Sequence, residues 1–378
     1  MKVALVYDWL NTRIGGGEQT LFTIAQLYPE ADIFCLVYNK KKFAPFLRER
    51  KITTSRLNSF PSFIKKRPNL LLPFIEGVVG HFDFTGYDLV ISVSSAWVKN
   101  ISVPKGTCHI SYCFSPARMI WDSWPKYLDT QKLGPFKLGP VSRFFVTRIV
   151  SRLRLWDYYA SKNVFEFVSI SDYISGRIQK YYHRTSKCIY PPTKLLDMPK
   201  QPQERTYFLC VSSLSQYKNI DLVIQTFLKN NLPLVIAGDG PDKHRLHELA
   251  GDAKNIHFAG RVSNEEKVHL LQNAKAFIFP SIEDFGIAPV EAMSAGTPVI
   301  ALRGGGLLET VKEGKAGLFF DSPTVESLQK CLNIFKRHIF DQKNIHTSVE
   351  KFSEEKFKTV FPDTIQKIYT KWRHEQPN

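Results

Sequence analysis

The sequence lacks the patterns that mark several common classes of protein. No run reaches the roughly 18 apolar residues that cross a bilayer, because Pro73 interrupts Leu70–Ile75. The first apolar run is too short for a secretory signal and instead predicts a strand over Val3–Tyr7. The six cysteines contain no Cys-x-x-Cys pair, so we expect reduced thiols in the core of a cytosolic protein.

Several short motifs of nucleotide and metal chemistry are missing too. Neither Gly-x-Gly-x-x-Gly nor the P-loop pattern occurs, since Gly314-Lys315 is followed by Ala316. No Asp-x-Asp pair is present, and His244–Glu248 does not have the order His-Glu-x-x-His that binds zinc. These absences disfavour hydride transfer and P-loop hydrolysis, and we expect no metal site.

Positive charge is present in excess, and it is unevenly distributed. The chain of 378 residues has 51 Lys and Arg against 35 Asp and Glu, a formal charge of +16. The first 200 residues hold 29 basic and 14 acidic groups, a net charge of +15, and the rest hold 22 and 21. Two domains that face different partners explain this asymmetry better than a uniformly basic nucleic-acid binder. No nucleic-acid-binding module is recognisable, so we expect no nucleic acid as a partner.

Short β-branched runs alternate with helical patterns in both halves, which is typical of parallel α/β layers. The predicted fold class is α/β, with two Rossmann-like lobes facing a central cleft. Tyr190-Pro191-Pro192 is the best candidate for a linker. We expect one domain over 1–195, a second over 205–348, and a final helix within 350–378 that returns to the first domain.

The individual elements follow from the same patterns. The expected strands are Val3–Tyr7, Ile33–Val37, Leu89–Val93, His109–Tyr112, Phe165–Ser169, Tyr207–Val211, Leu234–Ala237, Ala276–Pro280 and Pro298–Ala301. The expected helices are Glu18–Leu27, Ser142–Ser161, Asp172–Tyr182, Asn219–Lys229, Pro289–Ala295 and Phe352–Trp372.

The strongest chemical motif runs from Glu283 to Glu291, directly after an expected strand, where ligands bind in open α/β sheets. Pro289 is predicted to be the first helical residue, which leaves the amides of Phe285–Ala288 at a helix start that suits a phosphate. Carboxylates are unfavourable beside a phosphate, so both glutamates are interpreted as acceptors of sugar hydroxyls. Glu291 is explained equally well as a favourable acid in the first turn of a helix.

Two glycine runs also lie between an expected strand and the next helix. They are Gly15–Gly17 and Gly304–Gly306. Glycine lets a backbone approach an anion closely, although each run alone is explained equally well as a tight turn. Lys218 lies at another strand end, where it either reaches a diphosphate or faces solvent.

Basic and apolar residues interleave over Arg143–Trp156. Arginines at 143, 148, 152 and 154 punctuate a run of apolar side chains. Such a helix can lie on an anionic membrane, with about 1 kcal/mol from each basic group. A core helix with snorkelling arginine stems explains the pattern equally well. Lys65-Lys66-Arg67, followed by Leu70–Leu72, is a second candidate contact.

Together these segments resemble the GT-B glycosyltransferases of family 4, which are retaining enzymes that use nucleotide sugars. The resemblance is strongest to the bacterial mannosyltransferase-like branch that builds surface polysaccharides such as lipopolysaccharide. Its most specific part is Glu-x7-Glu followed by Gly-Thr-Pro-Val-Ile. The segments that carry it are Lys2–Trp9, Gly15–Glu18, Ala31–Tyr38, Tyr112–Asp122, Tyr190–Pro192, Leu214–Asp221, Gly238–Pro241 and Pro280–Glu309.

The resemblance implies a role for each matching residue. Glu283 would contact the donor sugar, Glu291 would bind the ribose, and Lys218 would hold the diphosphate together with helix-start amides. The glycines that begin at Gly15 would close over the reacting groups, and Arg118, with Trp121 and Asp122, would line the acceptor side. The implied catalytic residues are Glu283, Gly16, Gly17 and Arg118. The implied donor-binding residues are Lys218, Ser213, Phe285, Gly286, Ile287, Ala288, Glu291, Gly305 and Gly306, and the family is metal-independent.

Two positions depart from the family pattern. Phe114 stands where the family has a His that helps to position the transferred sugar. Ser213 replaces an Arg that partners the phosphate-binding Lys, and the lost contact is worth about 1.5–3 kcal/mol. Arg261 and Arg303 are candidates to restore the charge.

The sequence therefore predicts retaining transfer of a hexosyl group from a nucleoside diphosphate sugar to a lipid-linked or oligosaccharide acceptor. GDP-mannose is the preferred donor, and no other cofactor is expected. An anionic membrane surface is an expected partner, which would place the protein in the cytoplasm at the inner face of the cell membrane. The alternative is a weakened or inactive transferase-fold scaffold at the membrane, which Phe114 and Ser213 favour and the retained Glu283, Glu291 and Lys218 disfavour.

Overall fold

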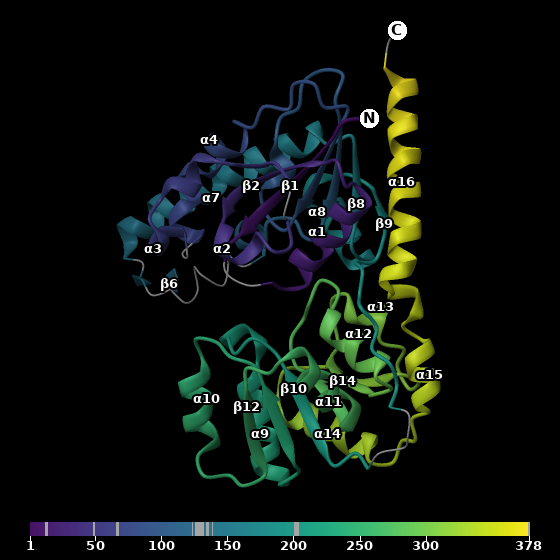
Figure 1. Ribbon diagram of the computed structural model, residues 1–378. Helices are drawn as coiled ribbons and strands as arrows, with labels where there is room; N and C mark the ends of the chain where they lie inside the picture. The colour runs from purple at the N-terminus through teal and green to yellow at the C-terminus, as the bar shows by residue number, and fades with distance from the viewer. Residues whose placement is uncertain are drawn as a thin grey trace. The chain divides into compact units, whose positions relative to one another are not determined.

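The computed structural model describes residues 1–11, 14–47, 50–65, 68–122, 124, 132–133, 136–137, 139–199 and 204–376. The chain divides into two compact units, one of Met1–Pro191 with Phe357–Asn378 and one of Pro192–Lys356 (Figure 1). The second unit extends beyond the predicted 205–348 because its two ends pair: Thr193 forms a parallel bridge with Ser353. Lys66 and Arg67 lie outside the described residues.

The first unit is built on a parallel sheet. Its described strands have the order β3-β2-β1-β4-β5-β8-β9, and the order reverses between β1 and β4. All residues of β4 and β5 are buried, as expected for strands in a parallel sheet that is covered on both faces. The strands are β1 Val3–Leu10, β2 Asp32–Tyr38, β3 Ile52–Thr54, β4 Leu89–Ser94, β5 Cys108–Cys113, β8 Glu166–Ser169 and β9 Ser186–Cys188, and a separate pair consists of β6 Lys132–Leu133 and β7 Phe136–Lys137.

Helices and short helical turns pack around this sheet. The last helix, α16 (Glu354–Glu375), joins the first unit from Phe357 onward, and the rings of Phe357 and Phe361 lie 5.9 and 5.3 Å from the Tyr112 ring. The others are α1 Gly16–Leu27, α2 Lys40–Phe43, η1 Arg56–Ser59, α3 Ser62–Lys65, η2 Pro68–Phe74, α4 Ile75–Val79, η3 Val98–Asn100, α5 Arg118–Trp121, α7 Pro140–Ala160, η4 Ser161–Asn163 and α8 Asp172–Tyr182.

A buried aspartate fixes the carboxyl end of β1. The Asp8 carboxylate accepts hydrogen bonds from the backbone N–H groups of Ser95, Ala96, Trp97 and Val98, at 2.7–3.0 Å. These amides follow β4, the neighbour of β1 at the point where the strand order reverses. A buried carboxylate is stable only with such partners, so Asp8 holds the two strand ends in register.

Buried His109 predicts a pH-dependent stability of the first unit. Burial lowers its pKa from 6.5 to about 3, and its Nε2 lies 2.9 Å from the Ser92 hydroxyl. The unfolded chain protonates this imidazole near pH 6.5, whereas the folded chain keeps it neutral. Its contribution to stability is therefore complete above pH 6.5 and is lost as the pH falls toward about 3.

Denaturant unfolding of the wild type and of His109→Gln between pH 6.5 and 5 tests this expectation. The wild-type free energy of unfolding should fall by up to about 1.4 kcal/mol for each pH unit more steeply than that of the variant. Equal slopes would show that His109 does not titrate as its burial implies.

The second unit repeats the same architecture. Its described strands are parallel in the order β12-β11-β10-β13-β14-β15, and the order reverses between β10 and β13. The predicted α/β class with Rossmann-like units is confirmed. The strands are β10 Tyr207–Val211, β11 Leu234–Ala237, β12 Ile256–Gly260, β13 Ala274–Phe279, β14 Val299–Leu302 and β15 Gly317–Phe320. The helices are η5 Gln216–Lys218, α9 Ile220–Asn230, α10 Lys243–Ala250, α11 Asn264–Asn273, α12 Ile287–Ser294, α13 Leu307–Thr310, α14 Val325–Phe335, α15 Gln342–Thr347 and η6 Glu350–Phe352.

Candidate functional site

Two loops meet where the strand order of the second sheet reverses. Lys218 follows β10, Glu283 follows β13, and Lys218 Nζ forms an ion pair with Glu283 Oε1. The side-chain Nδ2 of Asn219 donates to the backbone oxygen of Pro280 at 2.9 Å. Ligands of open α/β sheets bind outside the carboxyl ends of the strands at this reversal point. The two predicted residues therefore lie together where the fold places a ligand.

Aromatic rings hold the Lys218 ammonium in place. It lies 5.1 Å from the centre of the Tyr217 ring and 5.7 Å from that of the Phe279 ring. The exposed fractions of the Lys218 and Glu283 side chains are 14% and 23%. A cation beside aromatic faces and partly shielded from water interacts more strongly with an anion than an exposed one does. The alternative that Lys218 simply faces solvent is wrong.

The helix after Glu283 begins earlier than the sequence suggested. Helix α12 starts at Ile287, with Gly286 at its N-cap, so the expectation that Pro289 is the first helical residue is wrong. Proline is tolerated at this place because the first backbone N–H groups of a helix have no partner within it. The amides of Ile287 and Ala288 thus stand at the helix start, while the Phe285 ring is buried in the core.

The second predicted glutamate is also paired with a lysine. Glu291 Oε1 lies 2.7 Å from Lys267 Nζ, which connects α12 to α11, and their side chains are 18% and 24% exposed. The second unit therefore carries two separate Lys–Glu pairs, Lys218 with Glu283 and Lys267 with Glu291. Each carboxylate keeps oxygen atoms that can accept hydrogen bonds from hydroxyl groups, and each lysine can bind an anion.

The glycine run after β14 packs against the Glu283 loop. A Cβ atom on Gly305 would lie 2.2 Å from the backbone oxygen of Glu283, and one on Gly306 would lie 2.3 Å from that of Asp284. The Gly306 N–H donates to the Glu283 oxygen at 2.8 Å. These glycines have a packing reason within the chain, because they hold the loop that carries Glu283. Their contact with an anion stays a prediction.

Gly305→Ala tests this packing role. Gly305 has φ of +65°, and Gly314, with φ of +74°, is a matched control because the described residues leave open space around its Cβ position. Both substitutions strain the backbone, but only Gly305→Ala forces two segments apart. We expect Gly305→Ala to cost about 1–3 kcal/mol more than Gly314→Ala in denaturant unfolding. Equal losses would mean that the loops do not pack as closely as described.

The proposed replacement for the missing arginine is not supported at Arg303. Its guanidinium donates to Glu313 at 2.7 Å and to Asp321 at 2.6 Å, and these bonds raise its pKa further. Both carboxylates neutralise Arg303, and its suggested compensation for Ser213 stays a prediction. Ser213 itself is half-buried after β10, and Arg261 is exposed after β12.

In the first unit, the glycine run lies between β1 and α1, as predicted. Helix α1 begins at Gly16, and Glu18 accepts hydrogen bonds from the Gly15 N–H at 2.8 Å and from the Tyr7 hydroxyl at 3.1 Å. A Cβ atom on Gly17 would lie 2.7 Å from the Tyr7 oxygen and 3.1 Å from the Phe114 ring. Phe114, which stands where the sequence resemblance leads us to expect a His, therefore packs directly over Gly17.

The predicted acceptor residues take part in internal contacts of the first unit. Half-buried Arg118 begins α5. The Trp121 indole donates to Asp157 at 2.7 Å, and Asp122 pairs with Arg177. These contacts fix the α5 segment, and the predicted contact of Arg118 with an acceptor stays a prediction.

Sequence reasoning missed the buried ion pair behind this segment. Lys99 Nζ lies 2.7 Å from Asp157 Oδ1, and both side chains are fully buried. Asp157 also accepts hydrogen bonds from Asn100, Trp121 and Tyr182, each at 2.7 Å. The available signal was a lone acid within the basic and apolar helix α7.

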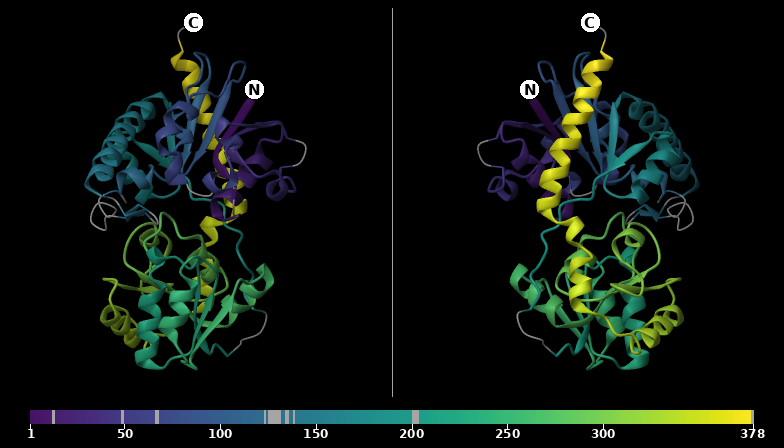
Figure 2. Two further views of the ribbon diagram at one scale, coloured as in Figure 1. Left: turned by 90° about the vertical axis from the view of Figure 1, so that its left-hand side faces the viewer. Right: turned by 90° about the vertical axis from the view of Figure 1, so that its right-hand side faces the viewer.

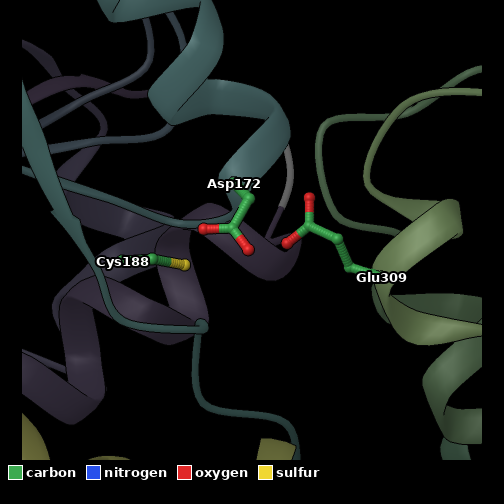
Figure 3. A group of neighbouring side chains, drawn as sticks. All are labelled: Asp172, Cys188 and Glu309. Carbon is green, nitrogen blue, oxygen red and sulfur yellow. The ribbon is translucent and has the colours of Figure 1, made fainter.

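A possible metal-binding group does not form a site within one unit. Figure 3 shows Asp172 in the first turn of α8 and Cys188 at the end of β9, both in the first unit. Glu309, the third residue drawn, lies in α13 of the second unit. The two candidate ligands of the first unit fall short of the three or four protein ligands of a zinc site, and we assign no metal site to this group.

The family of the second unit follows from comparison with known proteins. Residues 197–338 match the family described as Glycosyl transferases group 1, and this range contains Lys218, Glu283 and Glu291. This segment is similar to group 1 glycosyltransferases, and we call residues 197–338 the group 1 domain after this match. It covers less than half of the chain, and both Lys–Glu pairs lie within it.

Curated relatives of the chain include sugar transferases. The chain is 34% identical over 116 residues to the D-rhamnosyltransferase WbpZ of Pseudomonas aeruginosa, covering 29% of this chain and 30% of that protein. It is 31% identical over 141 residues to the GDP-mannose-dependent alpha-(1-6)-phosphatidylinositol monomannoside mannosyltransferase of Mycolicibacterium smegmatis, covering 33% of this chain and 37% of that protein. The chain thus spans about a third of the length of these relatives.

The similarity of fold extends over almost the whole chain. Anabaena Alr3699/HepE, solved in complex with UDP, superposes with a TM-score of 0.67 at 15% identity, covering 97% of this chain and all of that one. The group 1 domain and the unit that precedes it therefore have the two Rossmann-like folds of GT-B glycosyltransferases.

Proposed function

We propose that this chain is a retaining hexosyltransferase that moves mannose, preferably from GDP-mannose, to a lipid-linked or glycan acceptor of a surface polysaccharide. The observation that carries the proposal is the Lys218–Glu283 pair at the strand reversal of the group 1 domain. The cation suits the diphosphate and the carboxylate suits sugar hydroxyls. The M. smegmatis relative is named as a GDP-mannose-dependent enzyme, which supports the choice of GDP-mannose as the donor.

In the proposed reaction, the bond between C1 of the sugar and the β-phosphate oxygen breaks, and the acceptor hydroxyl oxygen bonds to C1. The leaving diphosphate gains negative charge, which Lys218 and the amides of Ile287 and Ala288 stabilise. The acceptor proton passes to the departing phosphate oxygen. The acceptor attacks from the same face that the diphosphate leaves, so the configuration at C1 is retained. We prefer this route to a covalent intermediate because Glu283 is paired with Lys218 and accepts hydrogen bonds from hydroxyl groups rather than acting as a nucleophile.

Ligand-induced stabilisation of the purified chain tests the donor. A ligand at 100 times its Kd stabilises the folded state by about 2.7 kcal/mol, and each kcal/mol raises Tm by about 2–4 °C in a domain of this size. We expect GDP and GDP-mannose to give the largest shifts in a panel that includes UDP, ADP and dTDP sugars. No shift with any nucleoside diphosphate would overturn the proposal. Binding without transfer to any acceptor would favour the inactive scaffold instead.

Glu291→Ala tests the proposed ribose contact. Loss of a carboxylate that accepts hydrogen bonds from the ribose hydroxyl groups should weaken binding of the nucleoside diphosphate by about 1.5–3 kcal/mol, which is roughly tenfold to a hundredfold. Calorimetric titration of the variant measures this loss, and Glu265→Ala, at the exposed start of α11, is the control. An unchanged affinity of Glu291→Ala would remove the ribose role.

A further inference from the structure

Helix α7 packs only one of its faces into the first unit. Val150, Leu153 and Ala160 are buried, and Asp157 is held in the Lys99 ion pair. The Trp156 ring stacks on that of Trp97, with centres 6.1 Å apart. The interpretation of Arg143–Trp156 as part of a core helix is therefore correct for the buried side of α7.

The opposite face of α7 is apolar and exposed. Val141, Phe144, Phe145, Leu155 and Tyr159 are 57–70% exposed, and no other described helix carries as many exposed large apolar side chains. Together with Arg148 and Arg152 they recur mostly at intervals of three and four residues from Val141 to Tyr159, so they follow one side of the helix. We call this side, with Arg148 and Arg152, the α7 stripe. Figure 2 shows α7 on the outer side of the first unit.

Every exposed charge on α7 is positive. Asp157 is the lone acidic residue of Pro140–Ala160, all of which the structure describes, and it is buried. Arg148 and Arg152 lie within the stripe, and the Arg148 guanidinium lies 5.2 Å from the centre of the Phe144 ring. Among the described residues, Glu76 pairs with the stripe at 2.8 Å from Arg152, and the Arg152 side chain is still 75% exposed. Lys162 continues the cationic character past the helix end, 5.1 Å from the Tyr159 ring.

We propose that the α7 stripe docks the protein on an anionic phospholipid surface. Phe144, Phe145 and Leu155 enter the boundary between headgroups and acyl chains, while Arg148 and Arg152 reach lipid phosphates. We choose an anionic bilayer as the binding partner because of charge complementarity. Its negative headgroups match the arginines of the stripe, and its acyl chains match the apolar side chains. The net charge of +15 on the first 200 residues adds long-range attraction of the same sign. This inference rests chiefly on α7 and does not depend on the proposed transfer reaction.

Sedimentation of the full chain with lipid vesicles tests the proposal. The wild type should bind vesicles of phosphatidylcholine mixed with phosphatidylglycerol, bind weakly to phosphatidylcholine alone, and be released by high salt. Phe144→Gln with Phe145→Gln should weaken binding at least tenfold through lost apolar insertion. Arg148→Gln with Arg152→Gln should weaken it about thirtyfold, at roughly fivefold for each basic group.

A matched variant separates the stripe from overall charge. Lys40→Gln with Lys105→Gln removes the same two charges from exposed positions of the same unit and should leave vesicle binding within about twofold. Phe145→Trp gives a second readout, because its fluorescence should shift to the blue on anionic vesicles if the ring enters the bilayer.

Three results would overturn the proposal. The first is absence of binding to anionic vesicles, and the second is equal loss of binding in the arginine and lysine variants. The third is a dimer of the wild type that Phe144→Gln with Phe145→Gln dissociates while vesicle binding is unchanged, since a second copy of the chain would then cover the stripe.

Discussion

Asp157→Ala is expected to lower the free energy of unfolding of the first unit by about 3–5 kcal/mol. The substitution leaves the Lys99 ammonium, which is fully buried, without its counter-charge. It also removes the acceptor for hydrogen bonds from Asn100, Trp121 and Tyr182. Each buried donor left unpaired adds a desolvation cost.

Denaturant unfolding of the whole chain measures this effect, with Asp363→Ala as the matched control. Asp363 pairs with Lys367 in α16, but their side chains are 60% and 71% exposed, so this pair should be worth less than about 1 kcal/mol. A loss below about 1 kcal/mol in Asp157→Ala would show that the buried pair is not formed as described.

Replacing both partners separates the charge from its hydrogen bonds. Lys99→Met with Asp157→Leu removes both buried charges and fills similar volumes, so it should recover part of the stability lost in Asp157→Ala. Recovery should be incomplete, because Trp121 and Tyr182 still lack the acceptor that they share. Recovery to the wild-type value would show that these two hydrogen bonds contribute nothing.

Many regular elements of the fold could be predicted because local patterns encode them. The prediction missed the strands Ile256–Gly260 and Gly317–Phe320 and the helices Lys243–Ala250, Asn264–Asn273 and Val325–Phe335. The bounds of Asp172–Tyr182, Tyr207–Val211 and Leu234–Ala237 agree with the structure to the residue. The edge strands Ile52–Thr54 and Ser186–Cys188 were not predicted, since three residues are too few to show an alternating pattern. Pairing with a neighbouring strand, rather than local sequence, makes these residues strands.

The candidate site was likewise predictable only in part from the local sequence. Placing Lys218 and Glu283 at strand ends required only the local pattern, but their pairing depends on the strand order, which brings β10 and β13 together. The two carboxylate partners of Arg303 are likewise brought to it by the turn before β15 and by the end of that strand. Tertiary contacts of this kind are not visible in a residue pattern.

Glu283→Gln is expected to tighten binding of the bare nucleoside diphosphate while lowering transfer of the sugar. In the structure Glu283 neutralises Lys218, so a diphosphate must displace the carboxylate and approach its negative charge. Removing that charge should strengthen binding of GDP by about 1 kcal/mol, or roughly fivefold. Transfer should fall tenfold to a hundredfold, because the charged acceptor of the sugar hydroxyls is lost.

Lys218→Met should change the same binding in the opposite direction. Losing the ammonium removes a charge-assisted bond to the diphosphate and should weaken GDP binding tenfold to a hundredfold. The control for Glu283→Gln is Glu326→Gln. It removes one negative charge from an exposed site of the same unit and should leave GDP affinity unchanged. Calorimetric titration with GDP and a transfer assay with GDP-mannose measure the two effects separately.

The double variant decides whether the Lys218–Glu283 pair is the cause. If Glu283 weakens GDP binding chiefly by occupying Lys218, then Glu283→Gln should have little effect in a Lys218→Met background. If it acts chiefly by repelling the diphosphate, the fivefold gain should persist in that background. A Glu283→Gln variant that binds GDP more weakly than the wild type would contradict both explanations, because the carboxylate would then hold the nucleotide itself rather than compete with it.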